Sequence, residues 1–177
     1  MYVLLNSNQM DRIYRRLALQ IWEEYEDLKN LAIIGIRTRG VFLAKRIAKY
    51  IKEYAGFDPD MGELDITFYR DDLSIVAEAP QVKGSNIPFS VENRDVLLVD
   101  DVLYTGRTVR AAMEQIFEFG RPKSIKLCVL IDRGWRELPI FANFVGKTIT
   151  TTDKQIVKVR LPETDPVEDE DVVLLER

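Results

Sequence analysis

Two adjacent aspartates, Asp100 and Asp101, follow an apolar run and stand directly before a loop of hydroxyls and glycine. Residues 96–109 read VLLVDDVLYTGRTV. In an open parallel sheet, ligands bind at the carboxyl ends of the strands, and a helix N-terminus at that edge attracts anions. Carboxylates accept hydrogen bonds from vicinal sugar hydroxyls, whereas loop amides hold phosphate. The stretch therefore favours a ribose phosphate as ligand.

Two other interpretations of this stretch stay open. The paired acids are compatible with a Mg²⁺ site of another kind, as in phosphate-transfer enzymes. They are also compatible with a strand-terminating turn and helix cap that have no ligand. The sequence contains neither the GxxxxGK[ST] nor the GxGxxG pattern, which disfavours nucleoside triphosphate or dinucleotide binding by those routes.

The composition limits the chemistry that is available. The chain has 177 residues, which predicts one domain over 1–177. It has no histidine and one cysteine, Cys128, within an apolar run, so a Ser-His-Asp triad, a Cys-His pair and a His-ligated zinc site are excluded. The net charge of −4 means that a nucleic-acid partner would need a local basic patch.

The apolar stretches also bear on location. No continuous apolar run is long enough to span a membrane, and the N-terminus lacks the basic start and long apolar region of a signal peptide. We therefore expect a cytoplasmic protein without membrane association.

The periodicity of apolar residues predicts an α/β protein. Amphipathic segments indicate helices, and continuous apolar runs indicate buried strands. The expected helices span 9–29, 41–54 and 108–120, and the expected buried strands span 31–36, 95–100 and 124–131. Strands that alternate with helices indicate a parallel sheet covered on both faces.

Other segments are less regular. Asn8 is the expected cap of the first helix. Alternation predicts a strand over 63–70, and the mixed segment 71–90 is expected to form a long mobile loop or a hairpin. Beyond Asp132 the chain has short strand-like pieces, among them 154–161 and 172–175.

Several of these stretches together resemble a known family. Residues 96–109 are similar to the motif that binds phosphoribosyl pyrophosphate (PRPP) in type I phosphoribosyltransferases. More closely, the chain resembles the PyrR family, the pyrimidine operon attenuator proteins that are also uracil phosphoribosyltransferases. Ordered matches from about residue 9 to about residue 161 include IGIRTRGVFLAKRIA, GELDITFYRDDLS, VKGSNIPF, GRPKSI and DRGWRELPI. The resemblance implies a parallel sheet flanked by helices, with a small hood and a flexible loop or hairpin.

The resemblance also implies residue roles. Asp100 and Asp101 would hold the ribose hydroxyls of PRPP and, with Arg39, are the expected catalytic residues. Thr38 and Arg39 match the pyrophosphate loop of the family, where the planar fork of arginine suits a diphosphate. The 5′-phosphate would be held by Val102, Leu103, Tyr104, Thr105, Gly106, Arg107 and Thr108.

The implied reaction converts uracil and PRPP to UMP and diphosphate, in a homodimer or higher homo-oligomer. Arg70 and Lys83 are expected on the flexible loop, in contact with the diphosphate, and Arg133 and Val157 on the uracil side. Mg²⁺ is the implied cofactor, held chiefly by PRPP oxygens and water, with assistance from the paired aspartates. Two alternatives are a regulator that senses PRPP and UMP with little catalysis, and a transferase for another base.

The chain departs from the family at positions that the resemblance links to RNA. Basic and polar residues are common at these positions, which here hold Ala18, Leu19, Trp22, Trp135, Phe141 and Phe144. Fewer cations lower the affinity for phosphate. We therefore hypothesise that the PRPP site is kept and that attenuator RNA binding is lost or changed, with the apolar replacements at a subunit interface.

Overall fold

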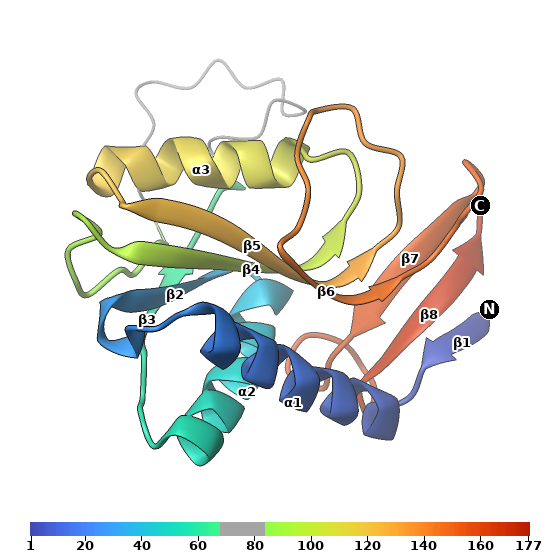
Figure 1. Ribbon diagram of the computed structural model, residues 1–177. Coiled ribbons are helices and arrows are strands. Elements are labelled where there is room, and N and C mark those ends of the chain that lie inside the picture. The colour runs from blue at the N-terminus through green and yellow to red at the C-terminus, as the bar shows by residue number, and fades with distance from the viewer. Residues whose placement is uncertain (68–83) are drawn as a thin grey trace.

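The computed structural model describes residues 1–67 and 84–177, and its centre is a five-stranded parallel sheet (Figure 1). The strands in spatial order are β3 (Asp60–Leu64), β2 (Leu31–Ile36), β4 (Asp95–Leu103), β5 (Ser124–Asp132) and β6 (Phe144–Thr148). Every neighbouring pair is parallel. The carboxyl ends of all these strands therefore meet at one edge, as predicted.

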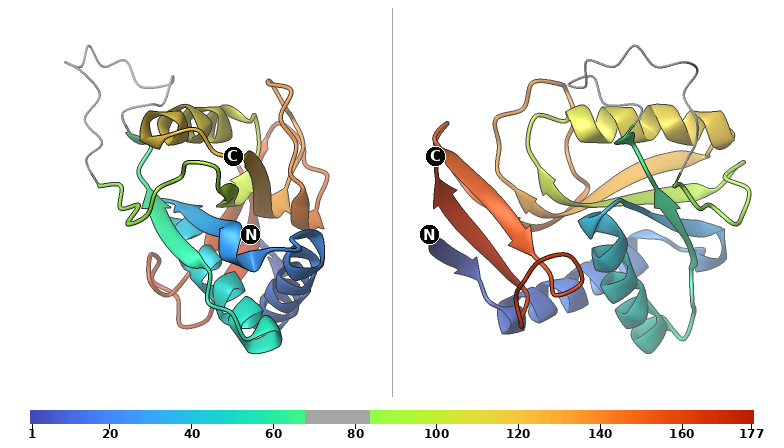
Figure 2. Two further views of the ribbon diagram at one scale, coloured as in Figure 1. Left: turned by 60° about the vertical axis from the view of Figure 1, so that its left-hand side comes forward. Right: turned by 180° about the vertical axis from the view of Figure 1, so that it is seen from behind.

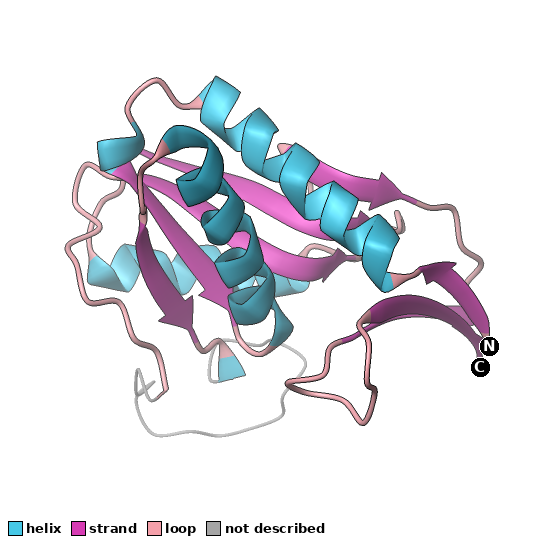
Figure 3. Cartoon of the chain, turned by 90° about the horizontal axis from the view of Figure 1, so that it is seen from below, coloured by secondary structure: helices cyan, strands magenta, loops and turns pink. Residues whose placement is uncertain are grey.

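Helices cover both faces of this sheet (Figure 2). Helices α1 (Ser7–Glu24) and α2 (Arg39–Ala55) lie side by side on one face (Figure 3), whereas α3 (Arg107–Phe119) lies on the other. Each face has its own apolar core. Cys128 is buried in the core on the α1 and α2 side, as expected. No helix in the described ranges is long and apolar enough to cross a membrane.

A small antiparallel sheet, which we call the hood, stands beside the main sheet. It has the order β1-β8-β7, with bounds Tyr2–Leu5 (β1), Asp171–Glu176 (β8) and Gln155–Arg160 (β7). Its inner residues Val157, Val159 and Val172 belong to the same core as α1 and α2. The predicted strands over 154–161 and 172–175 are confirmed as β7 and β8, and β1 was not predicted.

The bounds of α1 correct the sequence analysis at both ends. The cap is Asn6 and not Asn8: its side chain accepts the Gln9 N–H at 3.0 Å, while the Gln9 side chain accepts the Asn6 N–H at 2.9 Å. The helix ends at Glu24, and a short 3₁₀ turn, η1 (Leu28–Asn30), leads into β2. The apolar periodicity extends to residue 29 because Tyr25 and Leu28, which lie beyond the end of α1, pack against the same core.

The strands near the candidate site also differ from prediction. Strand β4 continues to Leu103, so both aspartates belong to the strand and not to its end. Strand β3 lies closer to the N-terminus than 63–70, because its parallel register pairs Ala32 with Asp60 and Ile36 with Leu64. Asn86, in the predicted loop 71–90, forms an antiparallel bridge with Glu63, and residues 71–83 of that loop lie outside the described residues.

Candidate active site

A cavity of about 340 Å³ opens at the carboxyl edge of the main sheet. We call it the edge cavity. Its lining comes from the ends of β2 and β4, the segment that follows β3, and the starts of α2 and α3: Ile36, Arg37, Thr38, Arg39, Asp65, Ile66, Thr67, Asp100, Asp101, Val102 and Thr108. The fold thus brings together, in one cavity, the two segments that the sequence analysis assigned to one ligand.

The paired aspartates form the acidic part of the edge cavity. The Asp101 N–H donates to Asp100 Oδ1 at 2.9 Å, and the Val102 N–H donates to Asp101 Oδ1 at 2.9 Å. Each carboxylate keeps a second oxygen to which no described N–H group is bound. Asp100 is only 7% exposed. Its burial, together with the neighbouring Asp101 carboxylate, raises the pKa of Asp100 well above its ordinary value.

Two glycines allow α2 to begin directly against the sheet. A Cβ on Gly40 would lie 2.4 Å from the Val99 carbonyl oxygen, and a Cβ on Gly35 would lie 2.5 Å from the Val41 Cα. These contacts leave no room for any other residue. They place the residues that start α2 next to Asp100. Neither glycine was predicted as functional from the sequence, although their position at a strand-to-helix junction was the available signal.

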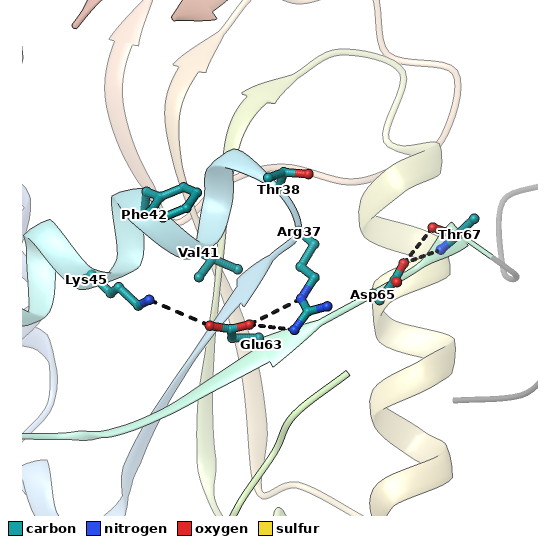
Figure 4. Close-up of a pocket in the computed structure, with 8 residues that line it drawn as sticks. All are labelled: Arg37, Thr38, Val41, Phe42, Lys45, Glu63, Asp65 and Thr67. Carbon is teal, nitrogen blue, oxygen red and sulfur yellow. Dashed lines mark hydrogen bonds and ion pairs between the residues drawn. The ribbon is translucent and has the colours of Figure 1, made fainter. Parts of the chain in front are cut away.

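The basic loop between β2 and α2 carries the expected diphosphate ligands. Thr38 caps α2 without a side-chain bond to the helix, and the Arg37–Thr38 peptide bond is cis. The Arg37 guanidinium donates to Glu63 at 2.7 and 3.2 Å, and Lys45 lies 3.7 Å from the other oxygen of Glu63 (Figure 4). This cluster lines a second cavity, of about 460 Å³, next to the first.

Arg39 does not extend freely into the edge cavity. Its guanidinium forms a forked ion pair with Asp165, on the loop between β7 and β8, with Nη2–Oδ1 and Nη2–Oδ2 distances of 2.9 and 3.0 Å. The predicted ligand of the diphosphate is therefore bound to the hood along one side.

The loop from β4 to α3 is held mainly through its backbone. Gly106 has a φ of +94° and precedes the first turn of α3, where the amides of Thr108 and Val109 have no intrahelical acceptor. Val102 and Thr108 line the edge cavity. By contrast, Leu103 is buried, and the Arg107 side chain pairs with Glu137 at 2.8 Å.

The segment after β5 supports this loop from behind. Three successive carbonyl oxygens of the loop accept hydrogen bonds from this segment. The Leu103 carbonyl accepts the Arg133 N–H, and the Thr105 carbonyl accepts the Glu137 N–H. The Tyr104 carbonyl accepts a hydrogen bond from Arg136 Nη1. Arg136 also pairs with both oxygens of Asp132 at 2.8 Å. The loop is therefore held in place before any ligand binds.

Asp65 and Thr67 line the edge cavity but were not predicted as site residues. The Asp65 carboxylate accepts both the N–H and the hydroxyl of Thr67 (Figure 4). The Asp65 N–H donates to Ser85 Oγ, which also accepts the side-chain amide of Gln115 at 2.9 Å. Gln115 is completely buried on α3, and a glutamine on an apolar helix face was the only signal for this arrangement.

Comparison with known proteins gives the family. Residues 3–164 match the phosphoribosyl transferase domain. The chain is 51% identical over 162 residues to the "Bifunctional protein PyrR" of Deinococcus radiodurans. The matched region covers 92% of this chain and 88% of that relative. The chain belongs to the PyrR family of phosphoribosyltransferases. The "Bifunctional protein PyrR" of Caldicellulosiruptor bescii is also 51% identical, over 92% of this chain and 89% of its own length.

Solved structures agree on the PyrR-family fold. The hypoxanthine phosphoribosyltransferase of Trypanosoma cruzi superposes with a TM-score of 0.73 at 18% identity and covers 99% of this chain and 97% of its own. At that identity the likeness concerns the fold alone, and it confirms the predicted sheet flanked by helices.

The residues expected on the base side of this PyrR-family chain lie apart from the edge cavity. Arg133 lines another cavity, of about 380 Å³, that residues 148–151 also line. The Arg133 guanidinium lies 4.1 Å from the centre of the Tyr104 ring and donates to the Gln155 carbonyl oxygen. Val157 is a core residue of the hood and does not line the edge cavity. Arg70 and Lys83 lie outside the described residues.

The substituted positions in this PyrR-family chain fall into two groups. Ala18 and Phe144 are buried, so their side chains are part of the core. Leu19, Trp22, Trp135 and Phe141 are exposed. The Trp135 indole N–H donates to the Thr151 carbonyl oxygen at 2.9 Å. The exposed group offers apolar surface where phosphate contacts would need cations.

Proposed function

We propose that this chain transfers the phosphoribosyl group of PRPP to uracil, which yields UMP and diphosphate. The observation that carries the proposal is the edge cavity, where the paired carboxylates, the N-terminus of α3 and the start of α2 meet. A sugar that carries a phosphate and a diphosphate matches all three elements: its hydroxyls match the carboxylates, its phosphate the N-terminus of α3, and its diphosphate the start of α2. Membership of the PyrR family supports the pyrimidine base.

The side chains of the edge cavity suit this reaction. Asp100 and Asp101 would accept hydrogen bonds from the ribose hydroxyls, and the amides that open α3 would bind the 5′-phosphate. A bond forms between uracil N1 and the ribose C1 while the bond from C1 to the diphosphate oxygen breaks, diphosphate leaves with the electron pair, and the N1 proton passes to water. Positive charge develops on the ribose in this transition state, and the fixed carboxylates stabilise it. Positioning and charge are thus the main contributions, and no histidine is required.

Mg²⁺ fits the donor set as a partner of PRPP. Within the described ranges, no three Asp, Glu, His or Cys side chains converge on one point. Because Mg²⁺ is usually bound by one or two carboxylates, water and substrate phosphates, Asp100 and Asp101 suffice on the protein side. When bound, the ion would neutralise diphosphate charge and improve the leaving group.

The direct test is turnover of radiolabelled bases with PRPP and Mg²⁺. We expect UMP from uracil and no nucleotide from hypoxanthine, guanine or orotate. Product from one of those bases instead would make the chain a transferase for another base. The absence of product from every base would favour a regulator that senses PRPP and UMP.

Regulation through RNA is a second candidate function, favoured by the word bifunctional in the names of the relatives. We expect weak binding to pyrimidine-operon leader RNA in a gel-shift assay, because Leu19 and Phe141 supply no cation for phosphate. The variant Leu19→Arg, Phe141→Arg is expected to bind the RNA more tightly than the natural chain. If the natural chain binds this RNA tightly and UMP strengthens that binding, the hypothesis that attenuator RNA binding is lost or changed is contradicted.

Two further features belong to the same proposal. We propose a homodimer or higher homo-oligomer, in which exposed apolar side chains such as Trp22 and Trp135 are covered. We also propose a cytoplasmic location, where PRPP and nucleotides are available.

A further inference from the structure

Asp165 is the most heavily bonded carboxylate near the edge cavity. Its side chain is only 4% exposed. Besides Arg39, it accepts the Thr164 hydroxyl at 2.7 Å and the Leu161 N–H at 3.2 Å, and it pairs with Lys158 at 3.2 Å. Burial alone would raise the pKa of Asp165, but the hydrogen bonds from Arg39 and Thr164 outweigh it and hold that pKa well below its ordinary value. The carboxylate is therefore charged and fixed.

The ion pair uses only one edge of the Arg39 guanidinium. Nε donates to Asp165 Oδ2 at 3.2 Å, and Nη2 donates to both oxygens. The two N–H groups on Nη1 have no partner among the described residues. Arg39 opens α2 and lines the edge cavity. A guanidinium that is clamped along one edge keeps its orientation, so its remaining donors are arranged before an anion arrives.

We propose that Asp165 is a positioning residue for phosphoribosyl transfer, which fixes Arg39 so that Nη1 faces the diphosphate of PRPP. The inference rests on the proposed function, because it takes PRPP as the ligand of the edge cavity. It assigns a reaction role to the hood loop 161–170, which holds the ligand-binding arginine on α2.

Asp165→Asn tests this proposal. The amide keeps the size of the side chain, but its NH₂ group cannot accept from the guanidinium, so the fork is lost. We expect the KM for PRPP, and the Kd for PRPP measured by calorimetry with Mg²⁺, to rise about tenfold, as for one hydrogen bond to a charged group. The KM for uracil should change little. Arg39→Ala and the double variant should weaken PRPP binding equally, because the two residues act as one unit.

Glu163→Gln is the matched control. Glu163 lies on the same loop and also ties it to α2, through Arg46 at 2.9 and 3.1 Å, but neither residue lines the edge cavity. For Glu163→Gln we expect unchanged PRPP affinity and a small change in Tm, similar to that of Asp165→Asn. Equal effects of the two variants on PRPP affinity, or normal affinity in Asp165→Asn, would overturn the proposal. If the natural chain transfers no phosphoribosyl group to uracil, the proposed base fails, whereas the calorimetric comparison still decides the role of Asp165.

Discussion

Gly40→Ala is expected to lower kcat/KM for PRPP by about 100-fold or more, because displacements of about 1 Å at a reacting centre have effects of that size. The added Cβ would lie 2.4 Å from the Val99 carbonyl oxygen and 3.3 Å from the Asp100 Cα, both of which are backbone atoms of β4. The backbone of β4 is held on both sides by neighbouring strands, so the start of α2 must move instead. Thr38 and Arg39 would then move away from Asp100.

The same substitution is expected to destabilise the fold by about 1–3 kcal/mol, the usual cost of overpacking. Gly56→Ala separates the two effects. Gly56 ends the same helix with a φ of +67°, and a Cβ added there would meet no atom within 4 Å, so alanine costs roughly 1–2 kcal/mol through backbone conformation alone. Steady-state kinetics and thermal unfolding of both variants should show a stability loss in each and an activity loss only at Gly40. Full activity of Gly40→Ala would show that the close approach is not needed.

Asp101→Asn should weaken PRPP binding by about 10- to 150-fold. A hydrogen bond from a sugar hydroxyl to a carboxylate oxygen contributes about 1.5–3 kcal/mol, the value for a hydrogen bond to a charged group. The paired aspartates supply the carboxylates that would accept such bonds from the ribose. An amide in place of Asp101 also presents an N–H donor to a hydroxyl or to Mg²⁺. Isothermal titration with PRPP and Mg²⁺ measures the change, and unchanged affinity would refute the assignment of these carboxylates to ribose.

Two companion variants sharpen this experiment. Asp95 lies at the opposite end of β4 from the edge cavity, where it accepts from Ser124 at 2.7 Å, so Asp95→Asn should leave PRPP affinity unchanged. Asp100→Asn should weaken PRPP binding while it raises the stability of the ligand-free protein near neutral pH. The sign follows from the pKa of Asp100, which is raised in the folded state. A raised carboxyl pKa means that stability falls as pH rises above the unfolded-state value, and the amide removes that loss.

The sequence predicted the centre of the fold well and its margins poorly. Strands β2 and β5 were predicted because strands buried on both faces are continuous apolar runs of strand length. Strand β6 has no such signal, since Gly146 and Lys147 interrupt it. Gly146 is needed there because a Cβ would lie 2.4 Å from the Leu130 carbonyl oxygen, a contact that appears only once the strands are paired.

The parts of the candidate site that are close together in the sequence could be predicted. The aspartates and the loop before α3 occupy one short segment, so residue types and spacing pointed to a sugar phosphate. Asp165 had no such signal, because Arg39 lies 126 positions away and the surrounding segment resembles an acidic turn. The contacts of Ser85 with Asp65 and Gln115 likewise join distant parts of the sequence, because Asp65 follows β3 and Gln115 lies on α3.

The order of strands in the hood has a consequence for synthesis on the ribosome. Strand β8 lies between β1 and β7, so β1 (Tyr2–Leu5) emerges early but cannot pair until Asp171–Glu176 has left the exit tunnel. The inner face of the hood shares a core with α1 and α2, which therefore have exposed apolar surface until the hood strands have emerged. Asp165 also follows all five strands of the parallel sheet in the sequence, and until it emerges Arg39 lacks its partner. The nascent chain consequently contains every strand of its parallel sheet before the arginine clamp that we assign to diphosphate can form.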